Sequence, residues 1–583
     1  MPRFDKFLNP AFCANNSTSP CPNKASKANS ACGRCYLVVY CSKKCQKEHW
    51  PTHKKDCNDP LAHETWKPDW HTEDRTPNFH KNQGPSEQDL NKCKMSWWGS
   101  MPALDLLKLD GNEGDDAPPK MRLLFSSSHD IRNIVETVAR LPDTYSGQCE
   151  IVMNGITSAI FAQNVLLVLT AFHFPPEEAV PIMIHLWYSA LIPVSLLTGL
   201  RRKLLPLIAE ACSEAARKRT NQLFKWIWKK NKAVLHVELM RDEWDRLGGF
   251  LKPPSYLSAA TAACNRQDVM LASNRKDNLH RFLFAQPRYW RVSTMKFWRD
   301  GILLPFGCSR KAFDTPNPLA SQPLHFTPQA INKIRIFFHA SRSWPMPDSA
   351  DPRTSWDLVE VCTGAYTASY PAKNDLYGRL FLYIRESLLG FCRQLSKRDI
   401  KLQLLSLDSL DLPEYFNRPG EHAGFDRIET YVTAEKDVLG IDTVLNISSS
   451  MLKPKIENPM AMILVLFIRD VEEMWKKDSL DKDVARAAKY LPEPETTDYN
   501  DADLLRNRRS SSFFCNVSKL FDLYKKSAGF DALSKYELKM RGNNTIVAHW
   551  PNRPGKYASQ EVFDILEASG ATGCERYVEW EWA

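Results

Sequence analysis

Over most of the chain, apolar residues follow two alternating patterns: short unbroken runs, and longer stretches with one apolar face. The run Met121–Phe125 leads into the small polar stretch Ser126–Asp130, and a helical pattern then continues from Ile131 to Leu141. A short apolar run indicates a buried strand, and apolar positions three and four apart indicate a helix. The order of strand, loop and helix predicts the opening of an α/β unit.

The same two patterns recur further along the chain. They predict strands at Glu150–Met153, Lys401–Leu407, Phe425–Thr430 and Met462–Ile468, and buried helices at Phe161–Phe172 and Val180–Leu191. Because strands and helices alternate, we expect an α/β fold.

Other stretches depart from this pattern. Residues 58–94 are rich in proline and histidine and predict a linker, and residues 284–325 predict loops. Residues 201–232 combine basic clusters with Trp226 and Trp228, which makes them a candidate basic amphipathic helix or a solvated face with buried tryptophans. Beyond an acidic, proline-bearing segment near residue 492, the chain is expected to be mostly helical.

The first sixty residues have little apolar patterning and seven cysteines. With one suitably placed histidine they offer eight potential metal ligands: Cys13, Cys21, Cys32, Cys35, Cys41, Cys45, His53 and Cys57. Eight ligands close two tetrahedral zinc sites. Cys41 and Cys45 lie four residues apart, as do His53 and Cys57, so each pair faces one way on a helix. An odd number of thiols and the absence of an apolar signal segment favour two Zn²⁺ ions over a disulfide scaffold.

This spacing resembles that of MYND-type zinc fingers. The matching pieces are Cys32-x2-Cys35, Tyr40-Cys41-x3-Cys45 and Trp50-x2-His53-x3-Cys57, whereas Cys13-x7-Cys21 is wider than the family's first CxxC pair. The resemblance implies a cross-braced finger, with Cys13, Cys21, Cys41 and Cys45 on one zinc and Cys32, Cys35, His53 and Cys57 on the other. It also implies docking of proline-containing segments of protein partners. His49 falls outside the pattern and is expected at the surface.

Composition and charge narrow the function further. The 583 residues are 43% hydrophobic and 25% charged, which is typical of a globular protein of several folded units. No apolar run is long enough to span a membrane, and we expect a location in the cytoplasm or the nucleus. Of the formal charge of +9, residues 1–60 supply +6, which zinc-bound thiolates reduce to about +3. The remaining +3 makes nucleic-acid binding, and transcriptional regulation through the finger, the weaker hypotheses.

Scattered motifs from Trp97 to about Trp475 resemble the axonemal dynein assembly factor three family and a DUF4470-like domain of fungal MYND proteins. They include Trp97–Leu106, Leu123–Asn133, Phe297–Gly301 and the two late strands. The resemblance implies a Rossmann-like, methyltransferase-like core interrupted by an insertion at roughly 210–400, and a role in assembly. The predicted domains are a finger (1–60), a linker (61–95), the α/β domain (96–480) and a mostly helical C-terminal region (481–583).

A methyltransferase needs a glycine-rich turn after its first strand and usually an acidic residue after its second. Here the turn is Ser126–Asp130, without glycine, and the second strand ends at Asn154. Asp130 is interpreted as a helix N-cap. Phosphate-loop, metalloprotease and serine-hydrolase motifs are absent from the sequence, as are the motifs of SET-type methyltransferases, and no catalytic residues are assigned. The leading hypothesis is a non-enzymatic, zinc-dependent interaction protein, and the alternative is an S-adenosylmethionine-dependent methyltransferase with a degenerate loop.

Overall fold

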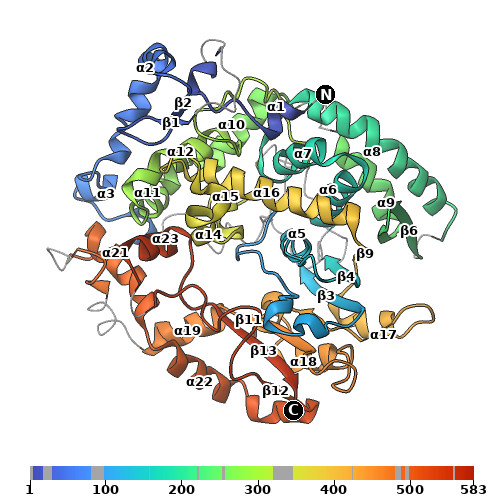
Figure 1. Ribbon diagram of the computed structural model, residues 1–583. Coiled ribbons are helices and arrows are strands. Elements are labelled where there is room, and N and C mark those ends of the chain that lie inside the picture. The colour runs from blue at the N-terminus through green and yellow to red at the C-terminus, as the bar shows by residue number, and fades with distance from the viewer. Residues whose placement is uncertain are drawn as a thin grey trace. The chain divides into compact units, whose positions relative to one another are not determined.

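The computed structural model describes residues 4–17, 21, 29–80, 97–155, 158–219, 222–252, 257–319, 344, 346–422, 424–478, 487–492, 498–555 and 558–583 (Figure 1). The chain divides into two compact units. Unit 1 comprises Met1–Ser100, Ala162–Gln222 and Met240–Cys392, and unit 2 comprises Met101–Phe161, Leu223–Leu239 and Arg393–Ala583.

Unit 2 is built on a nine-stranded sheet of the order β12-β13-β11-β10-β3-β4-β9-β7-β6. The strands are β3 (Lys120–Ser128), β4 (Gln148–Gly155), β6 (Leu223–Lys230), β7 (Ala233–Met240), β9 (Ile400–Leu405), β10 (Arg427–Glu429), β11 (Met462–Phe467), β12 (Leu538–Met540) and β13 (Arg576–Trp582). Neighbours from β11 through β10, β3, β4 and β9 to β7 run parallel, whereas β13 is antiparallel to both β11 and β12. The predicted mixed α/β class is confirmed.

The central strands are apolar because both faces of the sheet are covered, as is usual for parallel sheets. Every residue of β11 is buried, and so are eight of the nine residues of β3. One face packs Leu124, Ile428 and Val465 against the aromatic residues Phe416, Phe467 and Phe521. The helices of unit 2 are α5 (Arg132–Ala139), α17 (Leu412–Phe416), α18 (Ile441–Ser449), α19 (Arg469–Asp478), α21 (Ala502–Ser510), α22 (Val517–Ser527) and α23 (Gln560–Ala568).

Unit 1 is mainly helical. Besides the N-terminal finger it contains α1 (Asp5–Leu8), α3 (Asp69–Thr72), α7 (Pro176–Tyr188), α8 (Val194–Ala215), α9 (Arg241–Leu247), α10 (Ala259–Met270), α11 (Lys276–Phe284), α12 (Arg288–Asp300), α14 (Leu358–Thr363) and α15 (Ala365–Ala368). A short antiparallel pair, β5 (Leu191–Ile192) and β8 (Thr315–Pro316), also lies in this unit. Helices α6 (Ser158–His173) and α16 (Leu376–Lys397) begin in one unit and end in the other.

The structure corrects three sequence expectations. Residues 225–232 were a candidate basic helix or a solvated face with buried tryptophans; residues 223–230 instead form edge strand β6, in which Trp228 is buried, and the turn to β7 contains Asn231 in the left-handed region at φ 53°. Residues 288–300, predicted as loop, form α12, because Trp290, Phe297 and Trp298 recur on a buried face. The C-terminal region carries the expected helices but also β13, whose Tyr577, Val578 and Trp580 are buried in the sheet.

Residues 58–80, expected to be a linker, are ordered on helices of unit 1. Arg75 makes a bidentate ion pair with Asp277, at 2.6 and 2.8 Å, and the ring centroid of Trp66 lies 5.4 Å from that of His280. Trp70 is buried. This stretch contains few aliphatic residues, and its order depends on tryptophans and charges that a periodicity analysis does not detect.

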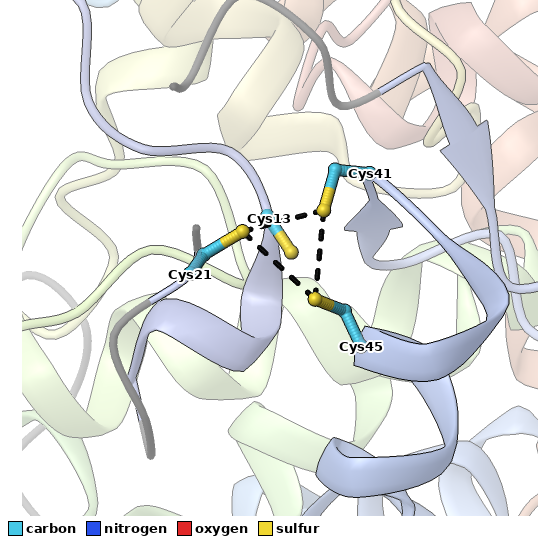
Figure 2. A group of neighbouring side chains, drawn as sticks. All are labelled: Cys13, Cys21, Cys41 and Cys45. Atoms are coloured by element: carbon cyan, nitrogen blue, oxygen red, sulfur yellow. Dashed lines mark hydrogen bonds between the residues drawn. The ribbon is translucent and has the colours of Figure 1, made fainter. Parts of the chain in front are cut away.

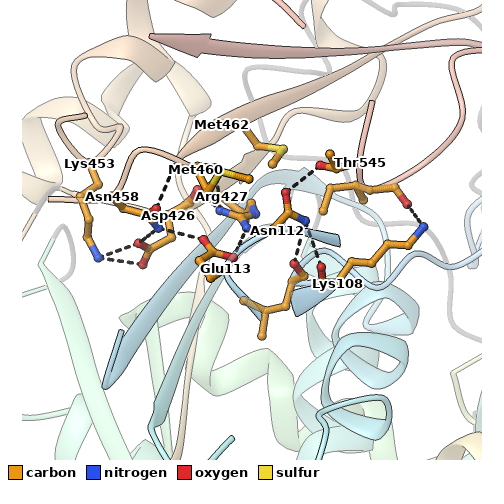
Figure 3. Close-up of polar contacts among 12 residues, drawn as sticks. Lys108, Asn112, Glu113, Asp426, Arg427, Lys453, Asn458, Met460, Met462 and Thr545 are labelled. Atoms are coloured by element: carbon orange, nitrogen blue, oxygen red, sulfur yellow. Dashed lines mark hydrogen bonds and ion pairs between the residues drawn. The ribbon is translucent and has the colours of Figure 1, made fainter. Parts of the chain in front are cut away.

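A buried polar network joins the loops at the amino ends of β10 and β11 (Figure 3). Arg427 contacts Glu113 at 2.6 Å, and Lys453 contacts Asp426 at 2.7 Å. Asn458 donates to both carboxylates, at 3.0 and 2.7 Å. Burial disfavours ionised Glu113, yet its pKa is lowered because Arg427 is so close. The network ties the loop before β3 to the start of β10.

Candidate metal centre

The finger begins as a short hairpin that presents two cysteines. Strand β1 (Ser30–Ala31) pairs antiparallel with β2 (Val39–Tyr40), and Cys32 and Cys35 lie in the turn between them. The backbone N–H of Tyr36 donates to the carbonyl of Cys32, at 2.9 Å. Helix α2 (Lys43–Cys57) follows, with Ser42 as its N-cap accepting from the N–H of Cys45 at 3.2 Å. The hairpin and the helix therefore hold ligands from distant positions side by side.

Cys13, Cys21, Cys41 and Cys45 converge at one point (Figure 2). The Sγ atoms of Cys21 and Cys41 lie 3.3 Å apart, those of Cys41 and Cys45 3.5 Å, and those of Cys21 and Cys45 3.9 Å. Zn–S bonds of about 2.3 Å in a tetrahedron place sulfurs about 3.8 Å apart. The spacing of these four donors fits a zinc ion.

Cys32, Cys35, His53 and Cys57 form a second group of four. The Sγ atoms of Cys32 and Cys57 lie 3.9 Å apart, and Nε2 of His53 lies 3.4 Å from Sγ of Cys35. Ligand atoms within each group lie within 4.8 Å of one another. Two distinct Cys/His sites are thus positioned to bind zinc, and the structure brings together the two sets of four that the resemblance implies.

The wide spacing between Cys13 and Cys21 is accommodated by local structure. Cys13 forms a parallel bridge with Val39 of the hairpin and is buried, and the turn η1 (Ala14–Ser17) follows it directly. The amide oxygen of Asn16 accepts from the N–H of Cys21, at 3.3 Å. Turn η1 therefore occupies the first part of this wide spacing, and residues 18–20 lie outside the described part of the chain.

The clustered thiols have perturbed acidities. Burial raises the pKa of Cys13 and Cys57, and a hydrogen bond to Cys32 raises that of Cys35, whereas hydrogen bonds from Cys35 and His53 lower the pKa of Cys32 to about 3. Crowding of sulfur atoms disfavours several thiolates together. A dication reverses this local field, because it stabilises all the thiolates that bind it.

His49 is buried, contrary to the expectation of a surface position. It lies four residues from both Cys45 and His53, on the same face of α2, and its Nδ1 is 3.0 Å from the hydroxyl of Tyr40. Burial and the neighbouring His53 lower its pKa to about 4. Helical periodicity in addition to ligand spacing would have placed this side chain inside the finger.

The finger packs against other parts of unit 1. Its hydrophobic cluster includes Val292 of α12 and Phe306. Asn374 makes two hydrogen bonds to the turn between β1 and β2. Its backbone N–H donates to the carbonyl of Tyr36 at 3.1 Å, and its side-chain amide donates to the carbonyl of Cys35 at 2.9 Å. Sequence analysis did not identify this contact, because it joins positions more than three hundred residues apart.

Comparison with known proteins agrees with this geometry. Residues 13–57 match the MYND finger family, and residues 97–192 match the domain of unknown function DUF4470. Over 40 residues, confined to the finger, the chain is 48% identical to N-lysine methyltransferase SMYD2 of Sus scrofa, Rattus norvegicus and Homo sapiens. That match covers 7% of this chain and 9% of the enzyme. No solved structure matches the chain.

The chain therefore contains a MYND finger, a zinc-binding module that mediates protein–protein interactions, and a DUF4470 domain. The predicted likenesses to a MYND finger and to a DUF4470 domain are confirmed. None of the described helices has both the length and the apolarity needed to cross a bilayer.

The carboxyl ends of β3, β4 and β10 bring together the residues predicted for a methyltransferase site. The amide of Asn154 donates to the carbonyls of Ser126 and Leu407, at 3.1 and 3.0 Å, and its oxygen accepts from the N–H of Leu407 at 3.0 Å. Two of these bonds join Asn154 to Leu407, just after β9, and the third joins it to Ser126, near the carboxyl end of β3. Its amide is engaged in tying the sheet edge together.

Polar side chains at this edge are paired among themselves. Asp130 is not the N-cap of α5, which is Ile131; its carboxylate instead contacts Nη1 of Arg132 at 3.0 Å and accepts from the Arg132 N–H at 3.3 Å. The rings of His129 and Tyr431 lie 5.3 Å apart. Burial raises the pKa of Glu429 to about 7, although Arg132 acts in the opposite direction.

Proposed function

We propose that this protein is a zinc-organised docking protein whose finger binds a proline-containing, acidic segment of a protein partner. In this proposal Cys13, Cys21, Cys41 and Cys45 ligate one zinc, and Cys32, Cys35, His53 and Cys57 the other. The ions supply no chemistry beyond holding α2 against the hairpin.

The observation that carries the proposal is an exposed tryptophan among lysines on α2. Trp50 is 40% exposed although the opposite face of its helix is buried. Lys43, Lys47 and Lys54 are also exposed, and their spacing of four, three and four residues through Trp50 places all four side chains on one face. An indole offers a flat surface for proline, and lysines favour carboxylates on either side.

We also propose that the sheet of unit 2 is a Rossmann-like scaffold. If β6 and β7, which precede β9 in the chain and extend the sheet beyond it, are left out, and β3, β4, β9, β10 and β11 are counted as first to fifth, the strand order is 3-2-1-4-5, as in dinucleotide-binding folds. This order favours the methyltransferase alternative. The pairing of Asn154, Asp130 and Arg132 with their own surroundings favours a scaffold. The likeness to SMYD2 bears on the finger alone and transfers no catalytic residues.

A role in assembly is the natural extension of this proposal. The finger would hold one partner while unit 2 offers a second surface, as the resemblance to dynein assembly factors implies.

The test is fluorescence anisotropy with the zinc-loaded full chain and a labelled peptide that carries a proline core and acidic flanks. We expect saturable binding that Trp50→Ala weakens about tenfold or more, because aromatic anchors dominate such interfaces. Binding unchanged by Trp50→Ala would contradict docking at this face.

Charge is tested with the double variant Lys47→Glu/Lys54→Glu. This variant should weaken binding of the acidic peptide but not binding of a matched peptide whose acidic residues are replaced by their amides. Arg201→Glu/Arg202→Glu on α8 is the control, since both side chains are exposed and away from the finger in sequence. An equal loss of peptide binding in the control would mean that the net charge of the chain, and not this face of α2, determines the affinity.

A further inference from the structure

Two buried cysteines of unit 2 meet although 59 positions separate them in the chain. Cys515 precedes α22 and is 3% exposed, and Cys574 precedes β13 and is 0% exposed. Their segments lie side by side, because Arg553 donates hydrogen bonds to the carbonyls of both Cys515 and Gly573. This thiol pair lies outside the finger and takes no part in the proposed docking.

The backbone of Gly573 permits this approach. At its φ of +76° a side chain is strained, and a Cβ there would lie 2.9 Å from a ring carbon of Phe513 and 3.1 Å from its Cα. The two segments are therefore pressed together over Phe513–Cys515 and Gly573–Cys574. A larger residue at position 573 would separate the sulfurs.

Arg553 clamps the same two segments. Its Nη1 donates to the carbonyls of Ser512 and Gly573, at 3.1 and 3.2 Å, and its Nη2 donates to that of Cys515 at 2.7 Å. Nη1 also lies 3.7 Å from Sγ of Cys515. A guanidinium beside a sulfur stabilises the thiolate, the form that attacks electrophilic sulfur.

A cavity of about 190 Å³ borders the other cysteine. Cys574 lines it together with Ser512, Phe513 and Thr572. This volume admits a small oxidant such as hydrogen peroxide. Cys574 therefore borders a cavity that such an oxidant can occupy, and Cys515 lies beside a cation.

We propose that Cys515 and Cys574 form a reversible disulfide when a hydroperoxide enters this cavity. The Cys574 sulfur attacks the peroxide oxygen, the O–O bond breaks, and one molecule of alcohol or water leaves. The Cys515 thiolate then attacks the resulting sulfenic sulfur, so that the S–S bond forms, the S–O bond breaks and water leaves with the remaining proton. Two thiols are oxidised by two electrons and one peroxide is reduced.

The bond would staple the loop before α22 to the start of β13. The hydrogen bond to Cys515 and burial both raise the pKa of Cys574. We therefore expect oxidation to be slow at neutral pH and to accelerate as the pH rises.

Peptide mapping of the full zinc-loaded chain tests the proposal. The chain is treated with hydrogen peroxide, alkylated, digested without reduction and analysed by mass spectrometry. We expect a cross-linked peptide joining Cys515 to Cys574 that disappears on adding dithiothreitol. Its absence at peroxide doses that oxidise the exposed Cys264 would overturn the proposal.

Variants supply the second readout. Oxidation should raise the midpoint of thermal unfolding of the wild-type chain and of Cys362→Ala, a control that removes another buried cysteine. Oxidation should leave the midpoint of thermal unfolding of Cys515→Ala unchanged. An equal rise in Cys515→Ala would show that another thiol is responsible, and would also overturn the proposal.

Discussion

Asn154 and Glu429 end two strands of the same sheet, and their environments differ in kind. Asn154 satisfies its whole amide with neighbouring backbone groups, as buried polar groups must. Glu429 accepts from the N–H of Tyr431, at 3.0 Å, but is fully buried. A carboxyl in such a place favours its neutral form. Burial is thus offset by hydrogen bonds at Asn154, whereas at Glu429 it favours the neutral carboxyl.

The raised pKa of Glu429 predicts how the stability of the fold depends on pH. Its pKa of about 7 in the folded chain is above the ordinary value of 4.5, so its contribution to stability is complete below pH 4.5 and is lost as the pH rises through 7. Glu429→Gln should match the wild type near pH 4.5 and be more stable at pH 8, by about 1–3 kcal/mol. Urea unfolding at both pH values measures this difference, and a variant less stable than wild type at pH 8 would contradict it.

At the scale of elements, the hydrophobic pattern predicted the strands that are buried on both faces of the sheet. The strands at residues 121–125, 401–407 and 462–468 were found because parallel strands buried on both faces are continuous apolar runs. β13 was missed because charged residues interrupt its apolar run, among them the buried Glu579, which pairs with Arg541 at 3.3 Å. α12 was missed because its aromatic residues are interleaved with arginines, so the sequence shows no clear apolar face and predicts a loop.

For the site, sequence was more informative. Ligand number and spacing predicted the eight ligands, because metal geometry constrains residue type as well as position, and the resemblance to MYND fingers implied their division into two groups of four. The attachment of the finger through Asn374, Val292 and Phe306 could not be predicted, since contacts over long sequence separations leave no local pattern.

This attachment predicts that zinc stabilises more than the finger. Chelation of the ions should increase hydrogen–deuterium exchange in α12 as well as in residues 29–57, because Val292 packs against the finger's cluster. Strand β11, in the other unit, is the internal reference and should not change. Faster exchange confined to residues 29–57 would mean that the finger is an independent module.

At the scale of the whole molecule, the two units carry different features. The metal centre and the exposed face of α2 belong to unit 1, and the large sheet with its paired polar edge belongs to unit 2. The MYND and DUF4470 matches together cover a minor part of the chain, and the chain spans under a tenth of SMYD2. These matches therefore identify two modules of the chain, and the function of the whole molecule depends on the side chains that those modules carry.

The most direct measurement of that account is calorimetric titration of one zinc-loaded preparation of the full chain. It would be titrated separately with the acidic, proline-containing peptide, with S-adenosylmethionine and with S-adenosylhomocysteine. We predict heat of binding with the peptide, lost in Trp50→Ala, and none with either cofactor form. Micromolar binding of S-adenosylmethionine that is lost on changing Asp130, with no heat from the peptide, would contradict the account and assign unit 2 to methyl transfer.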